Sequence, residues 1–288
     1  MRLVRYAGPQ GPRSGVWTSA GIVDAHEAMP AAEELFQPGD LLALLGADAT
    51  ARLRLADGAA RARAVDPESV RLLPPIANPS KIICCWVNYR EEGAAPPSKT
   101  PIFFGKFNNT LIGCHEPICL PRIASKVVVE AELAVIIGVG GHRIPAPEAL
   151  SHVGGYTIAN DVTAFSHRLI DLLGSRGPNM MAKTFDTFAP MGPCLVTSDE
   201  IGDPHALRIR QWLNDSLEVD SSTAHMLTDI PQFISYLSEF ITLEPGDIIL
   251  TGSPRPLGAL KYLSAGDRVR IEIESLGVLA NPVVADPQ

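Results

Sequence analysis

The chain has 288 residues, of which 46% are hydrophobic and 19% charged, and its formal net charge is −8 at neutral pH. That acidic balance excludes a broad basic surface of the kind that binds nucleic acid, and no apolar run approaches the roughly 20 residues that a membrane-spanning helix needs. The length allows one large domain or two, with a substantial core.

The first 78 residues are expected to form a small N-terminal α+β domain. They contain short strand-like stretches, and an alanine- and arginine-rich stretch at about 48–64 predicts a helix. This part of the chain has no constellation of catalytic residue types. The proline-containing segment 74–81 is expected to be an extended linker. Residues 79–288 would then form a second, larger domain.

The compartment can be inferred from two features. The opening residues lack the apolar core of a signal peptide, which favours a cytoplasmic protein. The chain has five cysteines, an odd number in a long sequence, and this suits reduced, buried thiols better than a disulfide framework.

From Lys81 onward, strand-like stretches follow one another with few helices between them. One amphipathic helix is predicted at 226–240, where Ile230, Phe233, Ile234 and Leu237 follow helical spacing. A strand-dominated order of this kind indicates a mainly β, α+β architecture rather than alternating β and α units. The predicted strands are KIICCWVNY, PIFFGKF, VVVEAELAVIIG, GYTIANDVTAF, GPCLVT, LRIRQWLN, GDIILTGS and DRVRIEIES.

The stretch 127–138 carries two glutamates inside a nearly continuous aliphatic run. If it forms one strand, Glu130 and Glu132 point to the same face, because side chains alternate along a strand. Two like charges on a half-buried face repel each other and are costly to desolvate unless a positive group lies nearby.

A third acid, Asp161, lies about thirty residues later in another apolar stretch. Three carboxylates on two strands of one sheet can converge on a hard cation such as Mg²⁺, Mn²⁺ or Ca²⁺. No cluster of cysteine and histidine competes for this role, which argues against zinc. Two alternatives remain open on spacing alone: neutralisation of the acids by Lys or Arg, and a strand face that is simply solvated.

Residues from about Lys81 to Val284 resemble the fumarylacetoacetate hydrolase family. The resemblance implies a mixed β-roll catalytic domain behind a small N-terminal domain, and a homodimer. It also implies a divalent ion, Mg²⁺ or Mn²⁺ with Ca²⁺ also compatible, at Glu130, Glu132 and Asp161. Six blocks carry it, in the family's order: KIICCWVNY, VVVEAELAVIIG, GGYTIANDVTAF, AKTFDTFAPMGPCLVT, LEPGDIILTGSP and GDRVRIEIESLG.

The family's chemistry implies a small 2-oxo or 2,4-dioxo acid as substrate. The carboxylate and 2-oxo oxygens of such an acid can chelate one ion, which then stabilises an enolate. By the same resemblance, Lys183 is the candidate catalytic lysine that adds positive charge or shuttles a proton. Tyr89, Thr251 and Gly252 are the candidate substrate-binding residues.

The sequence departs from its relatives where common members carry a histidine–glutamate pair that activates water. Glu92 stands in place of the histidine and Ala95 in place of the glutamate, so Glu92 is the remaining candidate base. Phe165 and Arg168 stand where relatives have arginine and glutamine, and Pro256 where glycine is usual. Arg168 and Arg255 are candidates for binding a second substrate carboxylate.

Three hypotheses follow. The first is a metal-dependent enzyme that acts on a 2-oxo acid or its enol by decarboxylation, or by keto–enol or double-bond isomerisation. These reactions need only an electron sink and a proton donor, so the loss of the histidine–glutamate pair favours them. The second is a C–C bond hydrolase in which Glu92, or a residue displaced from elsewhere, activates water. The third is a non-catalytic member that retains the fold and binds metal.

Overall fold

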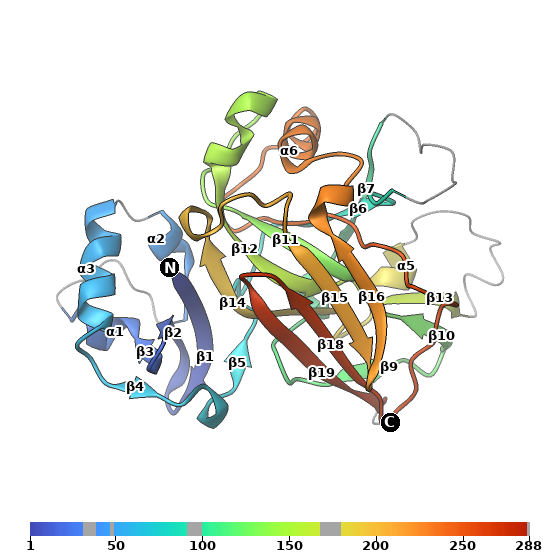
Figure 1. Ribbon diagram of the computed structural model, residues 1–288, viewed down its shortest axis with the longest axis horizontal. Helices are drawn as coiled ribbons and strands as arrows, with labels where there is room; N and C mark the ends of the chain where they lie inside the picture. The colour runs from blue at the N-terminus through green and yellow to red at the C-terminus, as the bar shows by residue number, and fades with distance from the viewer. Residues whose placement is uncertain (31–38, 47–48, 91–99, 168–179, 287–288) are drawn as a thin grey trace.

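The computed structural model describes residues 1–30, 39–46, 49–90, 100–167 and 180–286. The protein is mainly β with a few short helices, so the predicted α+β fold class is confirmed (Figure 1). No helix in the described ranges is long and apolar enough to cross a membrane.

The largest sheet extends through the whole molecule. Its strands are β1 (Arg2–Gly8), β2 (Gly11–Thr18), β3 (Gly21–Asp24), β4 (Ala64–Val65), β5 (Leu72–Leu73), β6 (Ile82–Trp86), β7 (Ile102–Lys106), β8 (Leu111–Ile112), β11 (Ala131–Ile137), β12 (Val153–Asn160), β14 (Ala189–Thr197) and β17 (Ile248–Leu250). Hydrogen-bonded neighbours follow the order β4–β3–β2–β1–β14–β12–β11–β17–β6–β7, with β5 beside β1 and β8 beside β14.

Two smaller sheets complete the β structure. A five-stranded sheet has the order β16–β15–β18–β19–β9, and a ribbon pairs β10 with β13. The five-stranded sheet lies at the front right of Figure 1, and the ribbon lies at the far right. The strands are β9 (Ile118–Leu120), β10 (Ala124–Val128), β13 (Thr163–His167), β15 (Arg208–Leu213), β16 (Ser216–Ser222), β18 (Arg268–Ile273) and β19 (Gly277–Ala285).

The helices are short and lie outside the sheets. Helix α6 (Ile230–Ser238) begins at Asp229, whose carboxylate accepts a hydrogen bond from the amide of Gln232 over 2.7 Å, as an N-cap does. Its buried residues include the four that predicted a helix there, so that prediction is confirmed. The other helices are α1 (Ala25–Ala28), α2 (Leu42–Leu45), α3 (Ala49–Ala59) and α5 (Met180–Lys183), with 3-10 turns η2 (Pro67–Ser69), η3 (Asn108–Thr110), η4 (Ala146–His152), η5 (Ser198–Glu200) and η6 (Thr223–His225).

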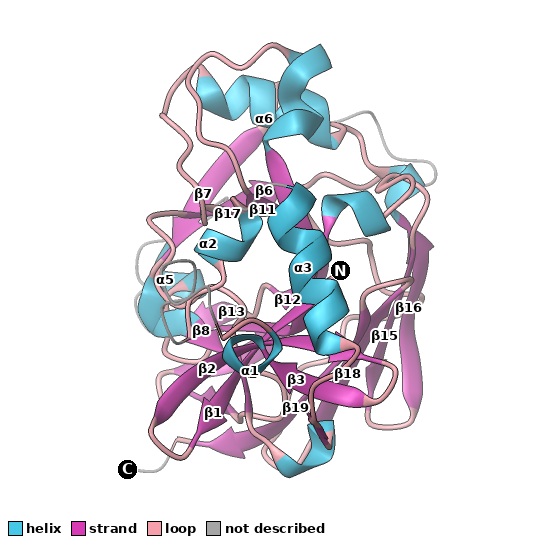
Figure 2. Ribbon diagram, turned by 90° about the vertical axis from the view of Figure 1, so that its left-hand side faces the viewer, coloured by secondary structure: helices cyan, strands magenta, loops and turns pink. Residues whose placement is uncertain are grey.

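The N-terminal strands continue the large sheet. Strand β1 pairs antiparallel with β14, with Leu3 opposite Leu195. Figure 2 looks onto α1, α2 and α3 in front of this part of the sheet. Ile76, within the segment expected to be a linker, is 2% exposed and belongs to the core. The division into domains at residue 78 stays a prediction.

The aliphatic character of β11 has a direct structural cause. Leu133, Val135 and Ile137 pack into one hydrophobic cluster, whereas Ala134 and Ile136 pack into another. Both faces of this strand are therefore buried, and its sequence shows no polar alternation. The described cysteines are free thiols, as expected, and all but Cys119 are buried.

The prediction of one continuous strand over 127–138 is wrong. Strand β10 ends at Val128 and β11 begins at Ala131, and the predicted strand around Asp161 is divided in the same way between β12 and β13. At the first break the chain passes from the β10–β13 ribbon into the large sheet, and at the second it passes from the large sheet back into the ribbon. The reason is that the backbone pairs with different strands before and after each break. The side chains of the acids at the breaks therefore point into a cavity and not into the hydrophobic core.

Candidate functional site

A cavity of about 690 Å³ lies where the large sheet, the five-stranded sheet and α5 meet. The three predicted carboxylates, Lys183 and Tyr89 all line it. Strands β15 and β16 contribute Gln211 and Glu218, and the chain after β17 contributes residues 253–256. Segments far apart in the sequence therefore converge on one site.

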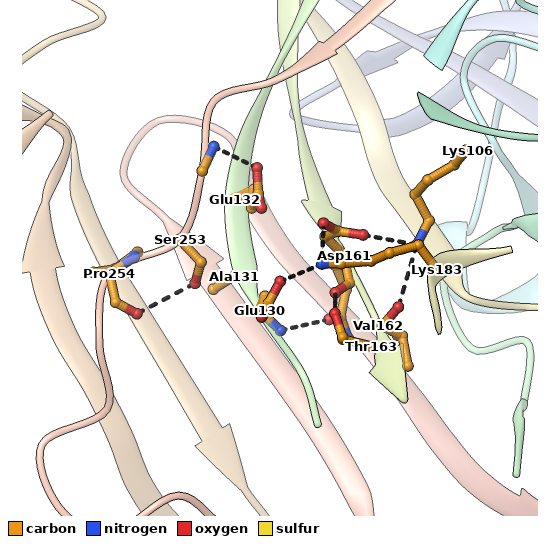
Figure 3. Close-up of polar contacts among 12 residues, drawn as sticks. Lys106, Glu130, Ala131, Glu132, Asp161, Val162, Thr163, Lys183, Ser253 and Pro254 are labelled. Carbon is orange, nitrogen blue, oxygen red and sulfur yellow. Dashed lines mark hydrogen bonds and ion pairs between the residues drawn. The ribbon is translucent and has the colours of Figure 1, made fainter. Parts of the chain in front are cut away.

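The three acids meet at the inner end of this cavity. Glu130, Glu132 and Asp161 each place one carboxylate oxygen within 4.8 Å of the others. Glu132 is 2% and Asp161 1% exposed, and Glu130 is partly exposed. Figure 3 shows Glu130 and Asp161 turned toward Lys183, and Glu132 farther along the same segment as Glu130.

The backbone at the two strand breaks holds the acids together. The amide of Asp161 donates to the carbonyl of Glu130 over 2.9 Å, and the amide of Glu130 donates to Asn160 Oδ1 over 3.0 Å. Gln211 Oε1 accepts from the amide of Ala131 over 3.0 Å, which ties the five-stranded sheet to the same place. The spacing of the carboxylates is thus fixed by main-chain contacts.

The electrostatic environments of the two most buried acids differ. Burial raises the pKa of Glu132 well above its ordinary value, and the charges of Asp161 and Glu130 raise it further. Burial also raises the pKa of Asp161, but Lys106 and Lys183 outweigh that effect and hold it below its ordinary value. The site favours an added cation, because a cation relieves the repulsion that disfavours the Glu132 charge.

Lys183 lies directly among the carboxylates. Its Nζ is 2.7 Å from Glu130 Oε2 and 2.6 Å from Asp161 Oδ2, and it lies 5.0 Å from the centre of the Phe104 ring. Burial lowers the pKa of Lys183, but the two acids raise it by more, so the group stays a protonated ammonium. The candidate catalytic lysine and the candidate metal ligands therefore form one cluster.

The segment after β17 forms the wall beside Glu132. The Gly252 amide donates to Glu132 Oε2 over 2.6 Å, and the Thr251 carbonyl accepts from Asn88 Nδ2 over 2.8 Å. Gly252 has a φ of +90°, and a Cβ there would lie 2.8 Å from the Cβ of Asn88. Glycine is required here because the backbone is left-handed and passes close to its neighbour.

Tyr89 is 4% exposed and lines the cavity. Its hydroxyl has no hydrogen-bond partner among the described residues, and burial raises its pKa, so it stays a phenol. A buried donor without a partner is uncommon, and Tyr89 lines a cavity large enough for a small ligand.

The far wall of the cavity carries two more cations. Arg255 and Lys261 line it, and Lys261 Nζ donates to Glu218 Oε1 over 2.6 Å and to Ser216 Oγ over 3.0 Å. Glu92 and Arg168, the other two candidate residues, lie outside the described residues.

Sequence reasoning missed Lys106, at the end of β7. Its Nζ donates to Asp161 Oδ1 over 2.7 Å and to the Val162 carbonyl over 3.2 Å, and its side chain is 0% exposed. One signal was present: alternation along PIFFGKF puts Lys106 on the same face as Phe104, a buried aromatic. A lysine on an apolar face implies a buried partner.

Comparison with known protein families gives one match over most of the chain. The model described as "Fumarylacetoacetate (FAA) hydrolase C-terminal" matches residues 81–284. Its bounds agree with the stretch in which the sequence blocks were found.

The relatives include enzymes of more than one reaction type. A mitochondrial oxaloacetate tautomerase of Bos taurus is 37% identical over 297 aligned positions, covering 99% of this chain and 92% of the relative. The solved maleylpyruvate hydrolase of Sphingobium sp. SYK-6, in complex with manganese(II) and pyruvate, is 30% identical with a TM-score of 0.84, covering 99% of this chain and 100% of that one. A 5-carboxymethyl-2-hydroxymuconate delta-isomerase of Mycobacterium smegmatis is 33% identical with a TM-score of 0.77, covering 100% of both chains.

Proposed function

Since this chain belongs to the fumarylacetoacetate hydrolase family, we propose that it is a divalent-metal-dependent tautomerase that interconverts the keto and enol forms of a 2-oxo dicarboxylic acid such as oxaloacetate. The observation that carries the proposal is the cluster in which Lys183 bridges Glu130 and Asp161 at the inner end of the cavity. Keto–enol exchange needs an electron sink and a proton carrier, and this cluster offers both.

The donor set fits a hard divalent ion. Three carboxylate oxygens lie within 4.8 Å of one another, and oxygen ligands suit Mg²⁺, Mn²⁺ and Ca²⁺. Glu130, Glu132 and Asp161 would hold it. When bound, the ion would supply a Lewis acid for the adjacent carboxylate and 2-oxo oxygens of the substrate. A relative is solved with manganese(II) and pyruvate, itself a 2-oxo acid, which supports this choice of ion and substrate class.

Lys183 and Tyr89 have different roles in the proposed reaction. In the enol-to-keto direction, the enol oxygen first loses its proton to solvent, and the positive charge on Nζ of Lys183 stabilises the resulting enolate. The Lys183 ammonium then delivers a proton to C3 of the substrate, and the amine regains a proton from solvent. The Tyr89 hydroxyl, for which no hydrogen-bond partner is found within residues 1–30, 39–46, 49–90, 100–167 and 180–286, donates a hydrogen bond to a substrate oxygen.

Several features support a dicarboxylic substrate. Arg255 and Lys261 line the same cavity as the carboxylate cluster, on the side of the loop that follows β17. A second substrate carboxylate would find a cation there, and Arg168 remains a further candidate for the same role. Thr251 and Gly252 precede Ser253, the first residue of this loop that lines the cavity, and neither is among the described residues that line it.

Hydrolysis of a C–C bond is the second candidate, because a relative of 30% identity is a maleylpyruvate hydrolase. Hydrolysis requires a base that activates water, and Glu92 is the residue available for that role. Tautomerisation is favoured because it requires no such base, and because the bovine relative that aligns with 99% of this chain is an oxaloacetate tautomerase. Decarboxylation would use the same electron sink as tautomerisation. The two reactions differ in their products, because only decarboxylation of oxaloacetate gives pyruvate.

The test follows three substrates by NMR: the enol form of oxaloacetate, acetylpyruvate and fumarylpyruvate. Each is incubated with the protein in Mg²⁺ or Mn²⁺, and again after removal of the ion with EDTA. Accelerated conversion of enol to keto oxaloacetate, dependent on the ion, is expected. Formation of pyruvate from oxaloacetate would assign decarboxylation instead, and cleavage of either acylpyruvate would assign hydrolysis.

A further inference from the structure

Lys106 is an ammonium group enclosed completely by protein. It lies at the end of β7, its side chain is 0% exposed, and it is not among the described residues that line the cavity. Burying a charge in this way is strongly unfavourable unless an opposite charge and hydrogen bonds compensate for it. Asp161 Oδ1 at 2.7 Å and the Val162 carbonyl at 3.2 Å provide that compensation.

The two oxygens of Asp161 have different cations. Lys106 contacts Oδ1, and Lys183, which lines the cavity, contacts Oδ2. Figure 3 shows both lysines beside Asp161. Lys183 also contacts Glu130 Oε2, so the Oδ2 side of Asp161 is the side that Lys183 joins to Glu130.

We propose that Lys106 is a positioning residue for the reaction. It holds Asp161 through Oδ1, on the side opposite to the contact of Oδ2 with Lys183, and contributes to the net charge of the centre. This inference rests on the proposed metal site, and it concerns a residue that is not among the described residues lining the cavity.

Lys106 contributes one positive charge to the net charge of the carboxylate–lysine centre. With all three acids ionised, three carboxylates and two ammonium groups give the centre one negative charge, and a divalent ion would change this to one positive charge. That single positive charge suits an anionic 2-oxo acid and the enolate formed from it. Without Lys106 the loaded centre is neutral, so it attracts cations more strongly but stabilises the enolate less.

A purely structural ion pair makes a different prediction. If Lys106 only neutralises a buried acid, its loss lowers stability and leaves the reaction of the metal-saturated enzyme unchanged. If it positions Asp161 and sets the charge, its loss changes Mn²⁺ affinity and kcat in opposite directions. The sign of the affinity change separates the two roles.

The experiment uses Lys106→Met and Lys106→Gln, since glutamine retains an N–H donor and protects the fold if methionine does not. Lys81→Met is the matched control, because Lys81 Nζ also pairs with a fully buried acid, Asp247, at 3.0 Å but does not line the cavity. Dissociation constants for Mn²⁺ are measured by electron paramagnetic resonance, and kcat is measured at saturating Mn²⁺.

Both Lys106 variants are expected to bind Mn²⁺ more tightly, by about tenfold or more, because a unit charge a few Å from the ion is removed. Their kcat is expected to fall by about tenfold or more, and Lys81→Met should change neither quantity. Unchanged or weaker Mn²⁺ binding in both variants would overturn the proposal. The Mn²⁺ measurement stands even if the wild-type protein proves not to be a tautomerase, so the two proposals fail separately.

Discussion

The backbone amide of Asp161 donates a hydrogen bond to the carbonyl oxygen of Glu130 over 2.9 Å, at the two places where the chain passes between the large sheet and the β10–β13 ribbon. This contact joins the two strand breaks and brings acids thirty-one positions apart to one centre. The carboxylates turn into a cavity at the breaks, and so three negative charges can be grouped beside a mainly apolar core.

Mn²⁺ should stabilise the folded protein, and Glu132→Gln should abolish that effect. An ion that binds only the folded state adds about 2.7 kcal/mol at 100 times its dissociation constant. Without the ion, Glu132→Gln should be at least as stable as the wild type, because burial already disfavours the Glu132 charge. Thermal unfolding with and without Mn²⁺ measures both effects.

Glu244→Gln is the control for this measurement, since Glu244 is 55% exposed and pairs with Lys81 outside the cavity. It should keep the full stabilisation by Mn²⁺. An equal rise in Tm for Glu132→Gln and the wild type would show that Glu132 is not a ligand.

Gly252→Ala should damage both stability and the site. The φ of +90° alone costs about 1 kcal/mol for a residue with a Cβ, and here that atom would also lie 2.8 Å from Asn88 Cβ. Because the displaced amide is the donor to Glu132, Mn²⁺ affinity should fall as well. Gly266→Ala is the matched control: its φ is +97°, but nothing lies within 4 Å of the added Cβ.

Urea unfolding and Mn²⁺ titration of the two glycine variants provide the test. Gly266→Ala should lose only the conformational cost and bind Mn²⁺ as the wild type does. Equal losses of stability in both variants, with unchanged Mn²⁺ affinity, would contradict the close packing described at Gly252.

Much of this fold could be predicted from sequence, where the signal is local. The spacing of Ile230, Phe233, Ile234 and Leu237 predicted α6, because one face of a helix repeats every three or four residues. The grouping of Glu130, Glu132 and Asp161 was also expected, from acids in otherwise apolar stretches.

Other features depend on contacts between distant residues and leave no local trace. The break between Val128 and Ala131 arises because the strand before it, β10, pairs with β13, whereas the strand after it, β11, pairs with β12. An aliphatic run has the same sequence pattern in either pairing. The pairing of β1 with β14 joins residues nearly two hundred positions apart. The contact of Lys106 with Asp161 required both the strand register and the partner to be known.

Tyr89→Phe should separate stability from catalysis. The Tyr89 hydroxyl is buried and has no partner among the described residues, so its removal should leave the free energy of unfolding unchanged or slightly higher. If the hydroxyl binds an anionic substrate oxygen, kcat/KM should fall by about 10- to 100-fold, as for loss of a hydrogen bond to a charged group. Unchanged kcat/KM would mean that Tyr89 contributes only its ring to the wall of the cavity.

Asp24 should make the N-terminal part of the sheet sensitive to acid. Burial raises the pKa of Asp24, but hydrogen bonds from Arg13 and Tyr6 outweigh it and hold the pKa below its ordinary value of 3.8. The unfolded chain then takes up a proton first as the pH falls. The stabilisation is present above about pH 4 and is lost as the pH drops through the folded-state pKa.

Urea unfolding of the wild type and Asp24→Asn from pH 7 to pH 2 measures this stabilisation. The variant should be less stable by about 2 kcal/mol at neutral pH, because two hydrogen bonds to a charged acceptor are weakened. The difference should shrink on acidification, while Mn²⁺ affinity at neutral pH stays that of the wild type. A difference independent of pH would contradict the assigned direction of the pKa.

The most direct test of the proposed chemistry is the exchange of the C3 protons of oxaloacetate with deuterium, followed by NMR at saturating Mn²⁺. Tautomerisation through Lys183 predicts rapid exchange in the wild type and near-complete loss in Lys183→Met, with Mn²⁺ still bound. It also predicts that Glu92→Gln exchanges almost as fast as the wild type. Exchange that survives in Lys183→Met, or a loss by the roughly 10²–10⁴ of general-base catalysis in Glu92→Gln alone, would contradict a mechanism built on the carboxylate–lysine centre.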